Sequence, residues 1–152
     1  MKKYLTVFLA LACMASLAAC AGRTAQKDSG TPDNAEVPED QFVINIVCQD
    51  KDIDQISYAA YVDGERRSMG RQAVLENGKD TTYTFTLRFS PDDFEEGDDV
   101  SQFSIALSPF RKGEKESVDT TEPVAIPIEY GSACAMTLFE DGGRYTAELL
   151  ET

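Results

Sequence analysis

Histidine and tryptophan are both absent from the sequence. Without histidine there is no Ser-His or Cys-His pair for nucleophilic catalysis, no histidine general base and no histidine ligand for the usual zinc sites. Paired carboxylates would remain available for glycoside hydrolysis, but no carboxyl group here stands in an apolar stretch that would tune its pKa. We therefore expect that the chain is not an enzyme.

Basic residues are also scarce, with 14 Lys and Arg against 27 Asp and Glu and a net charge of −13. Nucleic acids and anionic lipid surfaces attract basic patches, so this balance argues against both, and we expect no nucleic-acid partner. Two small basic groups stand on predicted turns, where such charges more often keep a loop soluble, and we assign them no role. They are Arg66, Arg67 and Arg71, and Arg111, Lys112 and Lys115.

An apolar run at the N-terminus is too short to be a stable membrane span. It extends from Tyr4 to Leu17, directly after Lys2 and Lys3. About 14 residues do not cross a hydrocarbon core that needs roughly 20 in a helix. The pattern is typical of the charged and hydrophobic regions of a signal peptide over residues 1–19.

The four residues that follow this run end in a cysteine, Leu17-Ala18-Ala19-Cys20. A branched apolar residue, two small residues and a cysteine resemble the lipobox of bacterial lipoproteins, whose thiol forms a thioether to diacylglycerol. The resemblance implies cleavage before Cys20 and acylation of Cys20, and two or three acyl chains make the membrane anchor effectively permanent. The alternative is an ordinary secretory signal with a chance cysteine.

The resemblance also bears on location. In such lipoproteins an Asp after the cysteine can favour inner-membrane retention in Gram-negative cells, and Ala21 stands there instead. An outer-membrane address and a Gram-positive host both stay open, and either places the chain in the cell envelope, facing outside the cytoplasm. Cleavage removes Lys2 and Lys3, which leaves 12 basic and 27 acidic residues and a net charge near −15.

The lipidated N-terminus and a flexible linker are expected over residues 20–40, followed by one domain over 41–152. From Ala21 onward Gly and Pro lie among polar residues, with Val37 as the one large apolar side chain, so the segment cannot bury enough to offset its ordering entropy. The 112 residues of the domain suffice for one core and are too few for two.

Period-two alternation of apolar residues dominates that domain and predicts strands. An antiparallel β-sandwich of seven to eight strands, with an immunoglobulin-like or related Greek key, is the expected fold. The alternating apolar sets are Phe42, Ile44, Ile46 and Cys48; Tyr83, Phe85, Leu87 and Phe89; Phe103, Ile105 and Leu107; Val124, Ile126, Ile128 and Tyr130; Cys134, Met136 and Leu138; and Tyr145, Ala147 and Leu149. Two weaker strand candidates span 56–62 and 71–76.

Turn residues between these candidates predict local hairpins. Asp63-Gly64, Asn77-Gly78 and Gly131-Ser132 suit two-residue hairpin turns, and residues 141–143 suit a slightly longer one. The last three strands are expected to form a meander through Gly131-Ser132 and 141–143. Ser90-Pro91 predicts a helix start, with Ser as N-cap, for one or two turns.

Two segments resemble pieces of bacterial immunoglobulin-like and fibronectin-type surface domains. They are residues 58–65, YAAYVDGE, and 143–149, GRYTAEL. No Trp is present to supply a core indole, and Ser132 rather than Tyr stands two places before Cys134. The resemblance therefore implies the sandwich class and not one specific family.

Four cysteines leave one pair in the domain, because Cys13 is lost with the signal and Cys20 is lipidated. Cys48 and Cys134 both fall on the apolar parity of their strands and are expected to point inward. Exported proteins form disulfides, so a buried Cys48–Cys134 bridge is the hypothesis, stabilising by roughly 4 kcal/mol in the chain-entropy model. Two separate buried thiols, favoured in an anaerobic host, are the alternative.

Acidic clusters suggest calcium as the one cofactor to consider. Asp50, Asp52 and Asp54 have alternate spacing after the first strand, and a second group of carboxylates crowds Gly97. Calcium binds six to eight oxygens, which converging loop carboxylates can provide. The first cluster is not an EF-hand, because Gln55 replaces the turn glycine and Tyr61 the bidentate Glu, and solvated loops explain both clusters equally well.

Two functional classes fit this sequence. The first is a membrane-tethered binding or interaction module that recognises an envelope protein, peptide or glycan through loops or a sheet edge. The second is a structural or accessory subunit of an envelope complex, with one apolar sheet face covered by a partner. Clustering of six apolar residues off the core parity would favour the second class. These residues are Val43, Val47, Ala59, Tyr61, Ala135 and Phe139.

Overall fold

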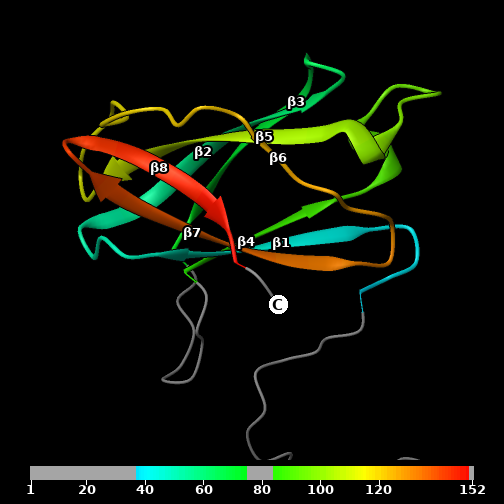
Figure 1. The fold of residues 1–152 in the computed structure, drawn as a ribbon. Coiled ribbons are helices and arrows are strands. Elements are labelled where there is room, and N and C mark those ends of the chain that lie inside the picture. Colours follow the sequence, from blue (N-terminus) through cyan, green and yellow to red (C-terminus); the bar gives the residue numbers. More distant parts are fainter. Residues whose placement is uncertain (1–36, 75–83, 151–152) are drawn as a thin grey trace, which may run out of the picture. The chain divides into compact units, whose positions relative to one another are not determined.

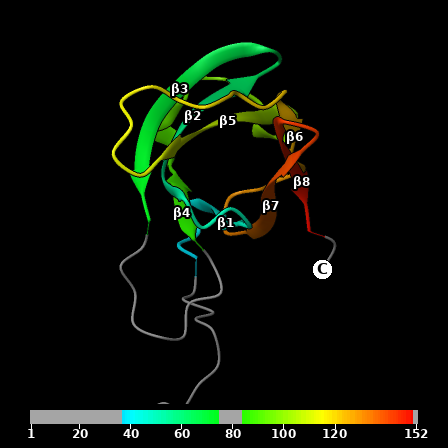
Figure 2. The same ribbon diagram turned by 90° about the vertical axis from the view of Figure 1, so that its left-hand side faces the viewer.

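The computed structural model describes residues 37–74 and 84–150. In these ranges eight strands form two facing four-stranded sheets, and two 3₁₀ helices lie between β4 and β5 (Figures 1 and 2). The elements are β1 (Phe42–Cys48), β2 (Ile53–Val62), β3 (Glu65–Ala73), β4 (Phe85–Phe89), η1 (Pro91–Asp93), η2 (Val100–Gln102), β5 (Phe103–Arg111), β6 (Val124–Ala125), β7 (Ala133–Asp141) and β8 (Arg144–Leu149).

The expected all-β sandwich is confirmed. Sheet A has the order β4-β1-β7-β8 and sheet B the order β3-β2-β5-β6. Every strand pair is antiparallel except β1 with β7, which run parallel. The parallel pair arises because the chain returns to sheet A beside the start of β1, where the Gly131 N–H donates to the Gln41 carbonyl and the Val43 N–H to the Ser132 carbonyl.

The core lies between the sheets and consists mainly of the residues that the alternation predicted to point inward. Phe42, Phe89 and Phe103 form its aromatic centre, with the Phe42 ring centroid 5.1 Å from that of Phe89 and 5.2 Å from that of Phe103. Tyr130 and Leu149 depart from the prediction, since each is 36% exposed at the margin.

Two predicted hairpin turns and the predicted helix start are confirmed. Asp63 and Gly64 have φ of 51° and 77° between β2 and β3, as a type I′ turn requires. Gly142 and Gly143, also at positive φ, join β7 to β8. Ser90 and Asp93 form a capping box at η1. The Asn77-Gly78 prediction lies outside the described residues.

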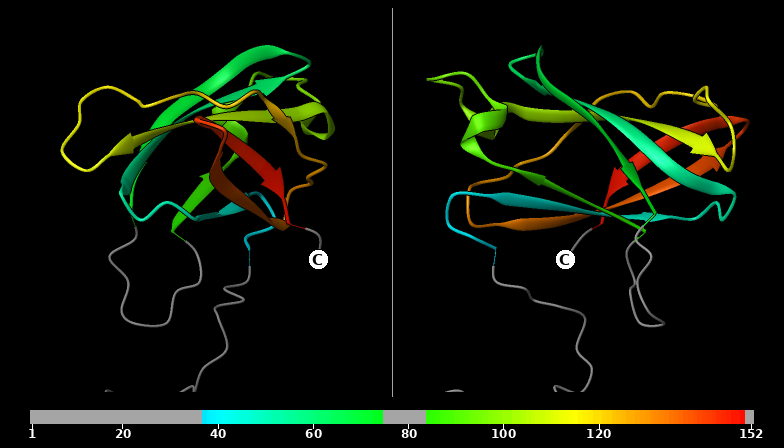
Figure 3. Two further views of the ribbon diagram at one scale, coloured as in Figure 1. Left: turned by 60° about the vertical axis from the view of Figure 1, so that its left-hand side comes forward. Right: turned by 180° about the vertical axis from the view of Figure 1, so that it is seen from behind.

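The predicted hairpin at Gly131-Ser132 is wrong. Only Val124–Ala125 of the expected strand is paired, and it joins β5 in sheet B. Residues 126–132 then cross to sheet A, visible as the orange segment in Figure 3. Ile126 and Ile128 are buried during this crossing, so their alternation reflects a buried connection and not a strand.

The third strand also differs from the prediction, because β3 spans 65–73 instead of 71–76. The predicted signal peptide, Cys20 and most of the expected linker lie outside the described residues. Within the described ranges, no helix has the length and apolar character needed to cross a membrane.

Candidate functional site

Cys48 and Cys134 do not form the expected disulfide, and both are free thiols. In the parallel β1–β7 pair, Cys134 lies opposite Ile44, four residues before Cys48. Four residues of strand span about 13 Å, whereas bridged cysteines have Cα atoms roughly 4.4–6.8 Å apart. The apolar alternation correctly predicted that both thiols face the core. It did not predict how far apart they lie along the two strands. Burial raises the pKa of each to about 11.

The Asp50 carboxylate is used within the fold. It accepts hydrogen bonds from the Tyr145 hydroxyl and, at 2.9 Å, from the Asp52 backbone N–H. The Tyr145 hydrogen bond is the largest of the causes that lower the pKa of Asp50, and burial, followed by Asp50, raises the pKa of Tyr145 to about 12. Asp50 thereby ties the β1–β2 turn to β8.

Calcium binding by Asp50, Asp52 and Asp54 stays a prediction that this arrangement does not support. The backbone carbonyl of Asp52 accepts a hydrogen bond from the Lys112 N–H, and that of Asp54 accepts one from the Val74 N–H. Across residues 37–74 and 84–150, no three His, Cys, Asp or Glu side chains lie together as a metal ion would need.

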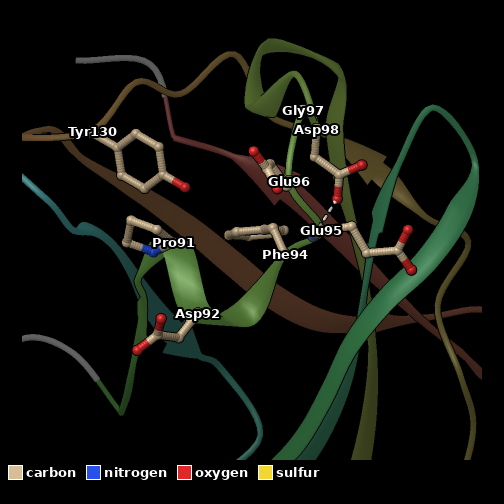
Figure 4. A pocket seen from close by; sticks show the side chains of 8 residues that line it. All are labelled: Pro91, Asp92, Phe94, Glu95, Glu96, Gly97, Asp98 and Tyr130. Carbon is tan, nitrogen blue, oxygen red and sulfur yellow. Dashed lines mark hydrogen bonds between the residues drawn. The ribbon is translucent and has the colours of Figure 1, made fainter.

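The second acidic cluster surrounds a shallow hollow of about 540 Å³ next to η1 (Figure 4). The rings of Phe94 and Tyr130 line it together with carboxylates. Figure 4 shows the Asp92 and Glu95 side chains pointing in opposite directions, which is the arrangement of solvated charges. Asp98 turns inward and accepts a hydrogen bond from the Glu95 N–H at 3.0 Å.

Arg67 of β3 fastens this acidic loop to sheet B. Its Nε lies 2.9 Å from the Asp98 carboxylate, and its Nη1 lies 2.8 Å from Glu65. The side chains of Arg67 and Asp98 are only 16% and 8% exposed, and the ion pair lowers the pKa of Asp98. Arg67 is therefore committed within the fold and is not part of a free basic patch.

A second hollow, of about 460 Å³, lies on the outer face of sheet B, and its floor is made of small residues. Ala59 of β2 pairs with Ala106 of β5, and two positions along, Ser57 pairs with Ser108. On the other side of β2, Met69 and Arg71 of β3 pair with Ala59 and Ser57. Two rows thus cross the sheet, each with a long side chain on β3 beside a floor of Ala or Ser.

Larger side chains bound this floor. Tyr61 follows Ala59 on the same face, and Met69 is 64% exposed. Arg71 reaches across Ser57 and places its guanidinium carbon 4.2 Å from the centroid of the Phe110 ring. This cation–π contact fixes the arginine while its side chain stays exposed. We define the outer-face hollow as Ser57, Ala59, Tyr61, Met69, Arg71, Ala106 and Ser108.

The six off-parity apolar residues divide between the two sheets. Ala59 and Tyr61 belong to the outer-face hollow, whereas the other four share the outer face of sheet A, on its two central strands. Val43 is only 4% exposed there, and Leu150, 41% exposed, donates its N–H to the Ala135 carbonyl. The remaining members of this group are Val47, Ala135 and Phe139.

Sequence reasoning missed most of the outer-face hollow. It assigned Arg71 no role and did not consider Met69, Ala106 or the serines. One pattern could have found it, because small residues alternate with large buried ones in Ser104-Ile105-Ala106-Leu107-Ser108. Such an alternation predicts a strand whose outward side is a flat floor.

No family model and no curated protein sequence matches this chain. Among solved structures, a disulfide-locked mutant of intermedilysin with human CD59 is similar over 74% of this chain, at 11% identity and a TM-score of 0.27. This chain spans 24% of the length of the chain that it matches. A similarity of that size carries no argument about fold or function.

Proposed function

We propose that this chain is a lipid-anchored protein of the bacterial cell envelope whose β-sandwich is a binding module. The observation that carries the proposal is the outer-face hollow. Its walls contain tyrosine and arginine, the residue types that dominate binding energy at protein interfaces, and methionine, which is enriched there. Its small floor leaves space for side chains of a partner.

Two of these wall residues are largely exposed in the folded domain. Met69 stands 64% exposed on the edge strand β3, and Arg71 is exposed as well. A single exposed apolar residue needs no explanation. Met69 differs because it borders Ala59, Ala106 and Tyr61 in one continuous hollow.

The anchor is tested separately from the binding surface. We expect Cys20→Ser to abolish incorporation of radiolabelled palmitate and to move the chain from the membrane fraction to the soluble fraction. Cys48→Ser, which alters a cysteine of the folded domain, is the control and should leave both readouts unchanged. Labelling that persists in the Cys20 variant would refute lipidation at this residue.

Binding is tested with the full chain purified in detergent and immobilised as bait for native envelope extract. Ala59→Arg fills the floor of the hollow without entering the core, since residue 59 points outward. We expect this variant to retain less than about a tenth of the wild-type amount of a stoichiometric partner. Circular dichroism establishes that the variant is folded, and undiminished capture would contradict the proposed surface.

A second candidate function is a structural or accessory subunit of an envelope complex. It is favoured by the shared position of Val43, Val47, Ala135 and Phe139 on sheet A. It is the weaker candidate because Val43 is already shielded and all but Val43 of the group are half-buried. Ala135→Arg tests this face in the same pull-down: loss of the partner here, with capture kept in Ala59→Arg, would favour the subunit.

A further inference from the structure

We infer that the outer-face hollow binds an extended acidic peptide segment of a protein partner, with a carboxylate on Arg71 and an apolar side chain against Met69 and Tyr61. This inference rests on the proposed function and names the chemistry of its ligand.

The charge pairing of Arg71 points to an anionic ligand. Among the described arginines, Arg67, Arg111 and Arg144 each lie within 4.0 Å of a carboxylate. Arg66, Arg71 and Arg88 do not, and of these three Arg71 is the one that lines the hollow. None of the described residues that line the hollow is Asp or Glu, so a ligand meets the charge of Arg71 without a competing carboxylate there. The stack on Phe110 holds the Arg71 guanidinium in place. Less side-chain entropy of Arg71 is therefore lost when a ligand carboxylate binds.

The spacing of the hollow matches an extended chain. The Arg71 row and the Met69 row lie two residues apart along the strands, which is about 6.7 Å. Side chains at positions i and i+2 of an extended peptide point to the same face with the same spacing. A peptide lying along the strands therefore places one side chain at Arg71 and the next at Met69.

The two rows also differ in polarity in the way that such a peptide requires. The Arg71 row continues into Ser57 and Ser108, and the Ser108 hydroxyl lies 2.8 Å from that of Thr120. The Ser57 hydroxyl, and whichever of Ser108 and Thr120 accepts in that pair, can donate to a second carboxylate oxygen. The Met69 row continues into Ala59 and Ala106, which offer only apolar surface.

A peptide fits this surface better than an anionic glycan does. Sulfated and uronic glycans carry charges along their length and bind clusters of cations, while the hollow holds one fixed arginine beside an apolar row. If a glycan bound, the apolar row would leave its sugar hydroxyls without hydrogen-bond partners, which costs binding free energy.

The test uses fluorescence anisotropy with the full chain in detergent. The probes are labelled octapeptides in which glutamate alternates with leucine, methionine, phenylalanine or alanine, together with versions that carry glutamine in place of glutamate. We expect saturable binding of at least one acidic peptide and roughly ten- to hundredfold weaker binding by Arg71→Gln, as for the loss of a charge-assisted hydrogen bond. The glutamine version of the same peptide should bind to the wild-type protein as weakly as the acidic peptide binds to Arg71→Gln.

Arg88→Gln is the matched control, because Arg88 is an exposed arginine on β4 of the other sheet and its loss changes the net charge equally. We expect less than about a twofold effect, since a charge this distant is largely screened. Equal losses in the two variants, or no binding by any acidic peptide, would overturn the inference. A third outcome would overturn the inference in favour of a glycan ligand: no peptide binds, but a chondroitin sulfate oligosaccharide does, and Arg71→Gln abolishes its binding.

Failure of this inference and failure of the proposed function are distinguishable. If no acidic peptide binds while Ala59→Arg still loses a partner from envelope extract, the hollow is a binding site with another ligand chemistry. If neither experiment shows an effect of the hollow, both proposals fall.

Discussion

The ring of Tyr58 lies against Gly70 on the neighbouring strand and occupies the space that a side chain at position 70 would need. A Cβ at Gly70 would stand 2.6 Å from the Tyr58 hydroxyl oxygen. The same ring meets Phe89 of β4 edge-on, with centroids 5.4 Å apart. Tyr58 thereby closes the seam between β3 of sheet B and β4 of sheet A, beneath the edge strand that carries Met69 and Arg71.

Gly70→Ala should destabilise the fold, because the new methyl group displaces Tyr58 from Phe89. The expected cost is about 1–3 kcal/mol, typical of overpacking, measured by urea unfolding. In a Tyr58→Ala background the same substitution should cost much less, since its steric partner is gone. Equal costs in the two backgrounds would show that Tyr58 does not require the glycine.

The Asp50–Tyr145 hydrogen bond predicts a dependence of stability on pH. Because the folded-state pKa of Asp50 is depressed, its stabilisation is present above the unfolded-state pKa and is lost as pH falls through the folded-state pKa. Tyr145→Phe removes the largest cause of that shift. We expect the urea midpoints of wild type and variant to differ by a steady amount near neutral pH and the difference to shrink as pH falls below the ordinary Asp pKa of about 3.9. A difference that does not shrink would contradict this account.

Arg67→Met should release the acidic loop from β3. Asp98 then loses its ion pair and holds the Glu95 N–H less firmly, so we expect faster hydrogen exchange at the Glu95 amide. Arg144→Met is the control, because that side chain is 71% exposed and lies 4.0 Å from Asp119. Surface pairs of this kind contribute little. Identical exchange in wild type and Arg67→Met would refute the anchoring role.

Both domain cysteines should be free thiols. We expect Cys48 and Cys134 to be fully alkylated in unfolded, unreduced protein and to react slowly in the folded protein, since burial raises the pKa of each to about 11. Peptide mass spectrometry measures both, with a reduced sample as the control. A cross-linked peptide joining the two residues would show that the strand register is different from that described here.

Hydrophobic alternation predicted the sandwich well because it reports which residues face the core. Phe42, Phe89 and Phe103 were placed inward from parity alone, and all three are buried. Alternation carries no information about which strand pairs with which. The predicted Gly131-Ser132 hairpin failed for that reason, because the chain crosses between the sheets there. The Cys48–Cys134 bridge failed because alternation does not give the offset between paired strands either, and Cys134 lies opposite Ile44.

The wall that β3 contributes to the outer-face hollow could not be predicted by the same rule. β3 is an edge strand whose sequence, ERRSMGRQA, contains little to bury, so period-two hydrophobicity is weak there. The stack of Arg71 on Phe110 joins two strands across a third and exists only in the folded sheet. The Asp63-Gly64 turn was the one local feature that indicated a strand beginning at Glu65.

The central claim is that the protein engages a partner through the outer face of sheet B. The most direct test places a photoreactive benzoylphenylalanine in place of Met69, or in place of Arg88 as the control, in the full chain within living cells. We predict a discrete cross-linked adduct from position 69 that Ala59→Arg abolishes, and no adduct from position 88. An adduct from position 88 alone, or none from position 69, would contradict the account.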